Sequence, residues 1–420
     1  MTPAPLWNRS FVLWLIGSAQ SRFATALASL ALSFLVLHQT GQAGQMAVTL
    51  ACALVPNLVM PLAGAWVDRI GLKRPLIGAN IVRGLLQLTV GGLALLGQQI
   101  GQDVPLWIIN GAAFLTGLAS SVASPAAGAA LPALVAPADL PRANGMMGSL
   151  AETMGLLGTF SGGFLVAAFS PAIAILLDGL SFLLMAALLL GVTLPNRGEV
   201  GVAPSNLWRD LRAGLSLMRR SRVLTVVPLL ALLVNAAIGP VLVVTPKLME
   251  TLGVGPRGYG LFLALEGVGM LLIGVLFASL GPRLPLRTCT LLGFALSAVA
   301  QACMWLWPTY VPLLVASLMF GLGIGLINTP LGTLLQQGVP AAYLGRVFAV
   351  LSAVGAVGMP LTLLLVSPLV DRWPLALWFG LNALGLALGG AVWGVLMRLE
   401  PRLPALSEEA LPLGEAPSTV

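Results

Sequence analysis

Five charged side chains stand inside long apolar stretches, and they are the residues best placed to do chemistry. They are three acids and two arginines: Glu152, Asp178, Glu266, Arg22 and Arg83. A charge at the centre of a bilayer costs on the order of 3 kcal/mol even on lenient scales, so one that persists there faces a cavity or a partner. A carboxylate in a low-dielectric cleft can exchange protons near neutral pH. The pattern therefore favours proton transfer inside a membrane.

The counted depth of these charges suggests their roles. With a rise of about 1.5 Å per residue, Arg22 and the three acids share the midplane band. We expect Glu152 and Glu266 to form the proton-coupling pair. Arg22 either modulates a carboxylate or forms a fixed neutralising pair with Asp178, and the residues leave both alternatives open.

Two further ionisable residues are expected to play peripheral parts. Arg83 counts out nearer the cytoplasmic interface, toward which a long side chain can extend its charge, so we expect it to snorkel there. His38, the lone histidine, falls at the end of the first apolar stretch and is expected to be a hydrated residue at the loop edge.

The elements that must position these charges are membrane-spanning helices. Of 420 residues, 58% are hydrophobic and only 8% are charged, which a water-exposed surface cannot match. A crossing needs about 20 apolar residues. The expected fold is an all-α membrane protein whose twelve transmembrane helices lie near residues 10–37, 45–67, 76–97, 106–131, 143–169, 171–194, 223–246, 258–280, 287–306, 311–335, 346–369 and 374–397.

The distribution of charge predicts orientation and excludes some partners. Most of the 21 Lys and Arg residues fall in loops on one side of these spans, and the positive-inside rule places that side, with both termini, in the cytoplasm. The net charge of +7 is therefore read as topology and not as nucleic-acid binding. No soluble domain of useful size remains. Three cysteines inside apolar runs predict neither disulfides nor a metal cluster.

The chain divides into two similar halves. We predict an N-terminal six-helix bundle over 1–194, a cytoplasmic linker over 195–222, a C-terminal six-helix bundle over 223–397 and a disordered tail over 398–420. The linker should contain an amphipathic interfacial helix, because Leu207, Leu211, Leu215 and Met218 recur at helical spacing. Gly155 and Gly158 are echoed by Gly355 and Gly358. Two pseudo-symmetric bundles around a midplane cavity are typical of secondary transporters.

One loop and one helix carry motifs. The loop after the second span reads GAWVDRIGLKRP, with a turn glycine and a charge cluster suited to a cytoplasmic gate. The gate residues are Gly64, Asp68, Arg69, Gly71, Lys73 and Arg74. The fifth span contains GTFSGG, in which Gly158, Gly162 and Gly163 permit close helix packing.

These motifs resemble those of the major facilitator superfamily. Further segments in register, such as SPAAGAALPALVAPADLPRANG and NTPLGTLLQQGVPAAYLGRV, are similar to the bacterial drug:proton antiporter branch that includes macrolide efflux and enterobactin exporter proteins. The resemblance implies that spans 1, 4, 7 and 10 line the substrate cavity. The polar and aromatic candidates on those spans are Gln20, Phe23, Thr25, Asn110, Phe114, Asn235, Phe320, Asn328 and Gln336. Thr25 stands where that branch usually has an aspartate, which puts coupling through that position in doubt.

The resulting hypothesis is a carrier and not an enzyme. We expect a multi-pass, monomeric protein of a bacterial cytoplasmic membrane that exports an amphipathic or hydrophobic small molecule, such as a drug, macrolide or siderophore-like compound. It should contact membrane lipid, use the proton gradient as energy source and need no metal or cofactor. The alternatives are a lipid or lysophospholipid flippase or an uptake carrier of the same fold, and a transport-inactive membrane sensor. The sequence has no phosphate-binding loop and no zinc-hydrolase motif.

Overall fold

The computed structural model describes residues 6–60, 63, 67, 70–194, 222–280, 283–339 and 341–400. The predicted interfacial helix and the acidic tail lie outside these residues, as do Gly64, Asp68 and Arg69 of the gate loop.

The described chain is helical throughout. Two short 3₁₀ segments, η1 (Val55–Val59) and η2 (Pro137–Asp139), join or extend the α-helices. The α-helices are α1 (Arg9–Thr40), α2 (Ala43–Leu54), α4 (Lys73–Ile100), α5 (Leu106–Leu134), α6 (Leu140–Ala168), α7 (Pro171–Leu190), α9 (Arg222–Thr251), α10 (Gly255–Leu280), α11 (Leu286–Leu306), α12 (Tyr310–Gly338), α13 (Ala341–Val366) and α14 (Leu375–Leu399).

In a membrane the apolar segments of this chain favour helices, and local residues determine where each helix begins and ends. In hydrocarbon every backbone polar group must be satisfied internally, which a helix achieves within one segment. The Asn8 side chain accepts a hydrogen bond from the Phe11 amide and so begins α1. Gly41 and Gly101 end α1 and α4 in the left-handed region, which glycine adopts without steric cost.

Ten of the described helices are long and apolar enough to cross a membrane. At the predicted second and eleventh spans, the described apolar stretches are shorter, Ala43–Val59 and Val357–Val366. Pro56 lies in the 3₁₀ segment of the former and Pro360 lies inside the latter. The helices follow the predicted spans in order along the chain, so the fold is a multi-pass all-helical one.

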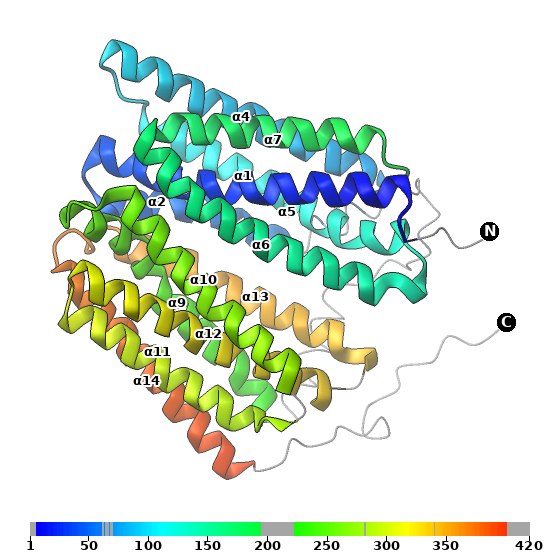
Figure 1. Cartoon of the computed structure of the whole chain (residues 1–420), viewed down its shortest axis with the longest axis vertical. Helices are drawn as coiled ribbons and strands as arrows, with labels where there is room; N and C mark the ends of the chain where they lie inside the picture. The colour runs from blue at the N-terminus through cyan, green and yellow to red at the C-terminus, as the bar shows by residue number, and fades with distance from the viewer. Residues whose placement is uncertain are drawn as a thin grey trace.

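The helices form two groups that meet along one seam. Helices α1–α7 pack mainly against one another and form the N-terminal bundle, whereas α9–α14 form the C-terminal bundle. The seam consists chiefly of α6 against α10 and of α2 against α13 and α9. We call the side where α1 begins and α14 ends the terminal side, and the opposite side the distal side. The two groups of ribbons approach each other at the distal side and spread apart toward the terminal side (Figure 1).

Candidate functional site: the cavities between two helical bundles

A carboxylate joins the bundles at the distal side. Asp371, in the turn after α13, accepts hydrogen bonds from the backbone amides of Ala43 and Gly44 at 2.9 and 2.8 Å. These amides begin α2 in the other bundle, where unpaired N–H groups and the helix dipole favour an anion. Lys247 of α9 donates to the same carboxylate at 2.5 Å. We call Asp371, Lys247, Ala43 and Gly44 the distal latch.

Other contacts close the same side. His38 at the end of α1 lies 3.5 Å from the Glu250 carboxylate at the end of α9, and both side chains are partly exposed. His38 is thus a loop-edge residue as expected, and in addition it bridges the bundles. Phe34 and Tyr259 pack with ring centroids 6.0 Å apart. The distal side is therefore shut by polar and apolar contacts together.

Glycines of α6 bring this helix into close contact with α10 across the seam and with α1 in its own bundle. A Cβ on Gly163 would lie 2.6 Å from the Pro256 carbonyl oxygen and 2.9 Å from the Gly260 Cα, so α6 and α10 nearly touch there. A Cβ on Gly158 would lie 2.2 Å from the Phe23 carbonyl oxygen. Gly162 faces α1 as well. Any side chain at Gly158 or Gly163 would push two helices apart.

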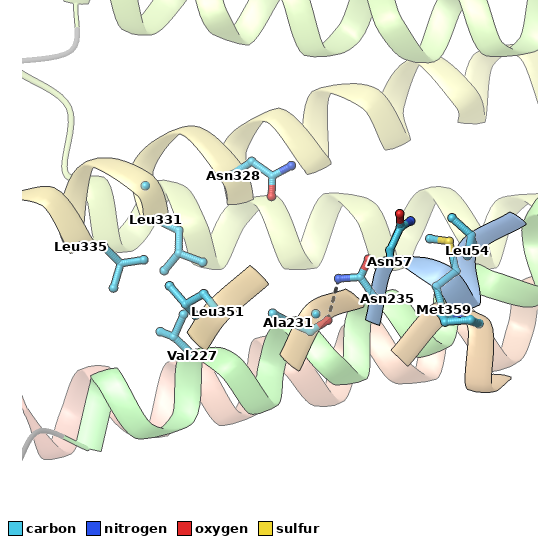
Figure 2. A pocket seen from close by; sticks show the side chains of 13 residues that line it. Leu54, Asn57, Val227, Ala231, Asn235, Asn328, Leu331, Leu335, Leu351 and Met359 are labelled. Atoms are coloured by element: carbon cyan, nitrogen blue, oxygen red, sulfur yellow. Dashed lines mark hydrogen bonds between the residues drawn. The ribbon is translucent and has the colours of Figure 1, made fainter. Parts of the chain in front are cut away.

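A cavity of about 480 Å³ lies on the C-terminal side of the seam. Its volume falls in the range of small-molecule sites, which is about 300–1,000 Å³. The lining comes from α9, α12, α13 and the end of α2 with η1, as Figure 2 shows. Among the described residues, none that lines it is charged. The lining residues are Leu54, Asn57, Val227, Ala231, Asn235, Asn328, Leu331, Gly332, Leu335, Leu351, Gly355, Met359 and Pro360.

Three amides are the strongest polar groups of this cavity. The side-chain amide of Asn235 donates to the Ala231 carbonyl oxygen at 2.8 Å (Figure 2). The side-chain oxygen of Asn235 is left available to a ligand. No protein hydrogen bond is recorded for the side chains of Asn57 or Asn328 in the described chain. A cavity of this kind suits a mostly apolar solute that carries hydrogen-bonding groups.

The nine predicted cavity residues separate into distinct environments. Asn235 and Asn328 line the cavity described above. Thr25 lines two smaller cavities in the N-terminal bundle. Gln20 instead donates to the Ser181 carbonyl oxygen at 2.9 Å and so joins α1 to α7. Asn110 accepts from the Thr49 hydroxyl at 2.7 Å.

The remaining predicted residues do not line the described cavities. Phe320 is 5% exposed and belongs to the core. Phe23 packs against that core, whereas Phe114 and Gln336 are exposed. Aromatic character alone could not tell the two faces of a span apart. Asn57 was not predicted, because the second span was not expected to reach the cavity.

Asp178 lies at the centre of a polar network inside the N-terminal bundle. Its side chain is 1% exposed. The Thr25 hydroxyl donates to Oδ1 and the Gln87 amide donates to Oδ2, each at 2.9 Å. Asp178 also borders a cavity of about 170 Å³ that Ser29, Ser33, Thr49 and Thr116 help to line. Thr25, which stands where the drug:proton antiporter branch usually has an aspartate, thus contacts an aspartate on another helix.

Arg83 corrects one sequence prediction. Its guanidinium lies over the Phe182 ring, 3.7 Å from the centroid, and its Nε is buried without a hydrogen-bond partner. It therefore points inward and does not snorkel to the interface. The depth was underestimated because α4 begins at Lys73, three residues before the predicted start. In the described chain, neither Arg83 nor Arg22 forms an ion pair with Glu152 or Asp178.

Glu152 and Glu266 lie on the two helices of the seam without touching. Gly163 of α6 lies level with Gly260 of α10, and Leu156 of α6 lies level with Gly267 of α10. These two contacts define the register of the antiparallel pair. Glu152 is therefore about five residues, or about 7 Å, nearer the terminal side than Glu266. The Glu152 side chain is exposed. It lies on the same face of α6 as Leu156 and Gly163, which contact α10.

The described part of the predicted gate loop is anchored within one bundle. Gly71 has φ 84°, which makes it the turn residue before α4. Lys73 donates to the carbonyl oxygens of Leu190 and Val192 at 2.9 and 2.8 Å. It thereby satisfies the end of α7, a favourable place for a cation. Arg74 is exposed.

The helices and cavities define a class, a multi-pass membrane protein of two helical bundles with cavities along their seam. Comparison with family models adds the family: the Major Facilitator Superfamily model matches residues 14–363 and 224–416. The chain therefore belongs to the Major Facilitator Superfamily, and it is a transporter by family.

Its relatives include efflux proteins at low identity. Macrolide efflux protein A of Streptococcus pyogenes is 22% identical over 382 residues, covering 90% of this chain and 93% of that protein. Multidrug efflux pump Tap of Mycobacterium tuberculosis is 28% identical over 404 residues, covering 92% and 93%. The chain thus matches the drug-efflux branch of the superfamily.

Solved structures share the fold. A bacterial homologue of the iron transporter ferroportin, in an inward-facing state, has a TM-score of 0.71 at 18% identity, covering 92% of this chain and 98% of that one. The nucleoside transporter NupG has a TM-score of 0.74 at 8% identity, covering 92% and 99%.

Proposed function

We propose that this protein exports an amphipathic small molecule by alternating access, with protons moving in the opposite direction. The terminal side is then the cytoplasmic face, as the excess of basic residues in its loops supports. Substrate enters the cavities from that side while the distal latch keeps the periplasmic side shut. The relatives named for macrolide and multidrug efflux support export.

The observation that carries the proposal is the cavity on the seam, whose described lining holds no charged residue. Its apolar walls and three amides favour a solute with an apolar body and a few hydrogen-bonding groups. Sugars and nucleosides would require a denser set of polar groups. An ATP-driven step has no phosphate-binding motif to support it.

Proton coupling is assigned to the acids of the N-terminal bundle and the seam. Asp178 is enclosed and hydrogen-bonded by Thr25 of α1, so a change in its protonation alters a contact between α1 and α7. Glu152 and Glu266 lie on opposite sides of the seam, where rocking of the bundles changes their surroundings. Arg22 lies beside Gly155, one turn from Glu152, and can respond to the charge of that acid.

The direct test uses proteoliposomes that contain the purified protein and a fluorescent amphipathic probe. With the protein oriented and an imposed pH gradient, probe movement should follow the gradient and stop when an ionophore collapses it. Movement that is unchanged after collapse would contradict antiport. A probe that equilibrates between leaflets without any gradient would support a flippase instead.

A further inference from the structure

Two guanidinium groups face one cavity in the terminal half of the N-terminal bundle. The cavity has a volume of about 290 Å³ and is bounded by α1, α4, α5 and α7. Its lining includes Arg22, Arg83, Asn80 and four serines, and no acid is among the described residues that line it. The serines are Ser18, Ser21, Ser120 and Ser124.

Neither arginine has a carboxylate within ion-pair distance in the described chain. Arg83 rests on the Phe182 ring and keeps a buried, unpartnered Nε. The two carboxylate oxygens of Asp178 instead accept hydrogen bonds from Thr25 and Gln87. The cavity therefore holds more positive than negative charge.

Arg22 adds the second charge, at the rim of the cavity. Its guanidinium lies against Gly155 of α6, where a Cβ would be 3.5 Å from its Nε. It is exposed, as is Ser124 across the cavity on α5, so a ligand can reach both. Glu152 does not line this cavity.

The excess of positive charge in this cavity favours binding of an anion. A cation within a membrane protein is costly unless it is paired, and guanidinium groups pair best with carboxylate or phosphate through two parallel hydrogen bonds. Serine hydroxyls can donate to the remaining oxygens of the same group.

The opposite bundle shows which end of a substrate the site would take. Gly355 of α13 faces the Asn235 amide, as Gly155 of α6 faces Arg22. At corresponding positions, one bundle thus presents a cation and the other a neutral amide in an apolar wall. An amphiphile would place an acidic end toward the N-terminal bundle and an apolar body toward the C-terminal one.

We propose that Arg22 and Arg83 form a binding site for the acidic group, a carboxylate or phosphate, of an amphiphilic substrate. This assignment rests on the proposed transport function and sharpens it, because it selects amphiphilic acids over lipophilic cations. Arg22 is the contact at the rim and Arg83 the contact in the interior.

The test measures binding of matched probes that share a fluorescent twelve-carbon chain. Their head groups are carboxylate, phosphate, hydroxyl and trimethylammonium, and the protein is the full chain in a neutral detergent. The carboxylate or phosphate probe should bind about tenfold tighter than the hydroxyl probe, with the trimethylammonium probe weakest. Whichever acidic probe binds tighter identifies the acid. Equal affinity for acidic, neutral and cationic heads would overturn the proposal.

Variants separate the site from general folding. Arg22→Gln and Arg83→Gln should each remove the preference for the acidic head about tenfold while leaving affinity for the hydroxyl probe unchanged. Arg83→Lys keeps the charge and should keep part of the preference, which covers the case in which Arg83→Gln fails to fold. Arg398→Gln, exposed in the last turn of α14 and outside the cavity, is the matched control. A Gln variant that weakens all four probes equally would indicate a structural role and would refute the assignment.

Flux of the same probes distinguishes this proposal from the transport function itself. Proteoliposomes that move the hydroxyl probe but show no preference for the acids would refute only the acidic site. Proteoliposomes that move none of the probes, although the purified protein binds the acidic ones preferentially, would refute transport and leave the site standing.

Discussion

At the scale of single residues, Asp178 is a buried acid whose two carboxylate oxygens both accept side-chain hydrogen bonds. Thr25 of α1 and Gln87 of α4 donate to its two oxygens, so three helices meet at this carboxylate of α7. Protonation removes the charge that these groups stabilise and weakens the contacts between α1 and α7. A carboxylate in this position can therefore couple proton binding to helix movement.

The substitution Asp178→Asn tests this role, because asparagine keeps the size but cannot bind or release a proton. We expect gradient-driven accumulation of substrate to fall at least tenfold, while exchange of substrate at equal pH on both sides continues. Asp103→Asn, at an exposed loop position on the distal side, is the control. Undiminished accumulation in Asp178→Asn would exclude Asp178 from coupling.

The two seam glutamates make a separate prediction. Glu152→Gln and Glu266→Gln should each abolish proton-coupled flux and leave substrate binding within about twofold. Because they are offset by about 7 Å along the seam, we expect each to act by itself. Normal coupling in both variants, measured as proton uptake during substrate efflux, would remove them from the mechanism.

Some of these residues can be predicted from the sequence and others cannot. A charged residue inside an apolar stretch is easily recognised, so the sequence alone is enough to select Asp178, Glu266 and Arg22 as candidate functional residues. The partner of each charge depends on helix rotation, which composition does not encode. For that reason the sequence places Arg83 at the interface, and Gln20 and Phe320 in the cavity, where the structure does not. The tripeptide Val-Asp-Arg, which occurs at 67–69 and again at 370–372, is the available signal for Asp371.

At the scale of elements, the approach of α2 to the turn after α13 depends on one glycine. A Cβ on Gly44 would lie 2.3 Å from the Ser367 carbonyl oxygen and 3.0 Å from the Asp371 carboxylate. Glycine is required here for close contact and not for an unusual backbone angle, since only Gly41, Gly71, Gly101, Gly253 and Gly255 have positive φ in the described chain.

Gly44→Ala should therefore open the distal side. We expect the population closed at that side to fall about tenfold, since the backbone oxygen cannot move aside as a flexible side chain would. The measurement is the distance between spin labels at Gln99 and Thr309, in a background without the three native cysteines. Gly78→Ala, where an added Cβ meets nothing within 4 Å, is the control. An unchanged distance distribution in Gly44→Ala would contradict the packing described here.

The pH response of the distal latch follows from the charge of Asp371. Partial burial would raise its pKa, but hydrogen bonds from Lys247 and from the Gly44 and Ala43 amides outweigh burial and lower the pKa below its ordinary value. A lowered pKa means that closure is fully supported above the ordinary Asp range and is lost only as pH falls through the lowered value.

The same spin labels check this response. In a His38→Gln background, which removes the neighbouring titratable side chain, the closed population should be equal at pH 7.5 and pH 5. Adding Asp371→Asn should lower it at both values. Opening between pH 7.5 and pH 5 in the background alone would show that Asp371 does not hold the latch as an ionised group.

At the scale of the whole molecule, the two bundles are joined at the distal side, and we propose that this arrangement is one state of a transport cycle. The halves are alike where helices must pack: Gly158 meets the Phe23 carbonyl and Gly358 meets the Leu232 carbonyl. They differ around Gly155 and Gly355, where one bundle presents Arg22 and the other the Asn235 amide. We propose that alternating access uses the likeness of the halves and that recognition of an amphiphile uses the difference.

The measurement that tests the central claim most directly is gradient-driven flux through the purified protein. Proteoliposomes are loaded with the carboxylate probe, and a pH gradient is imposed and then collapsed with an ionophore. The account predicts probe movement against its concentration gradient while the pH gradient lasts, together with proton movement in the opposite direction and loss of both in Asp178→Asn. Probe movement at the same rate without the gradient, or in the absence of proton movement, would contradict it.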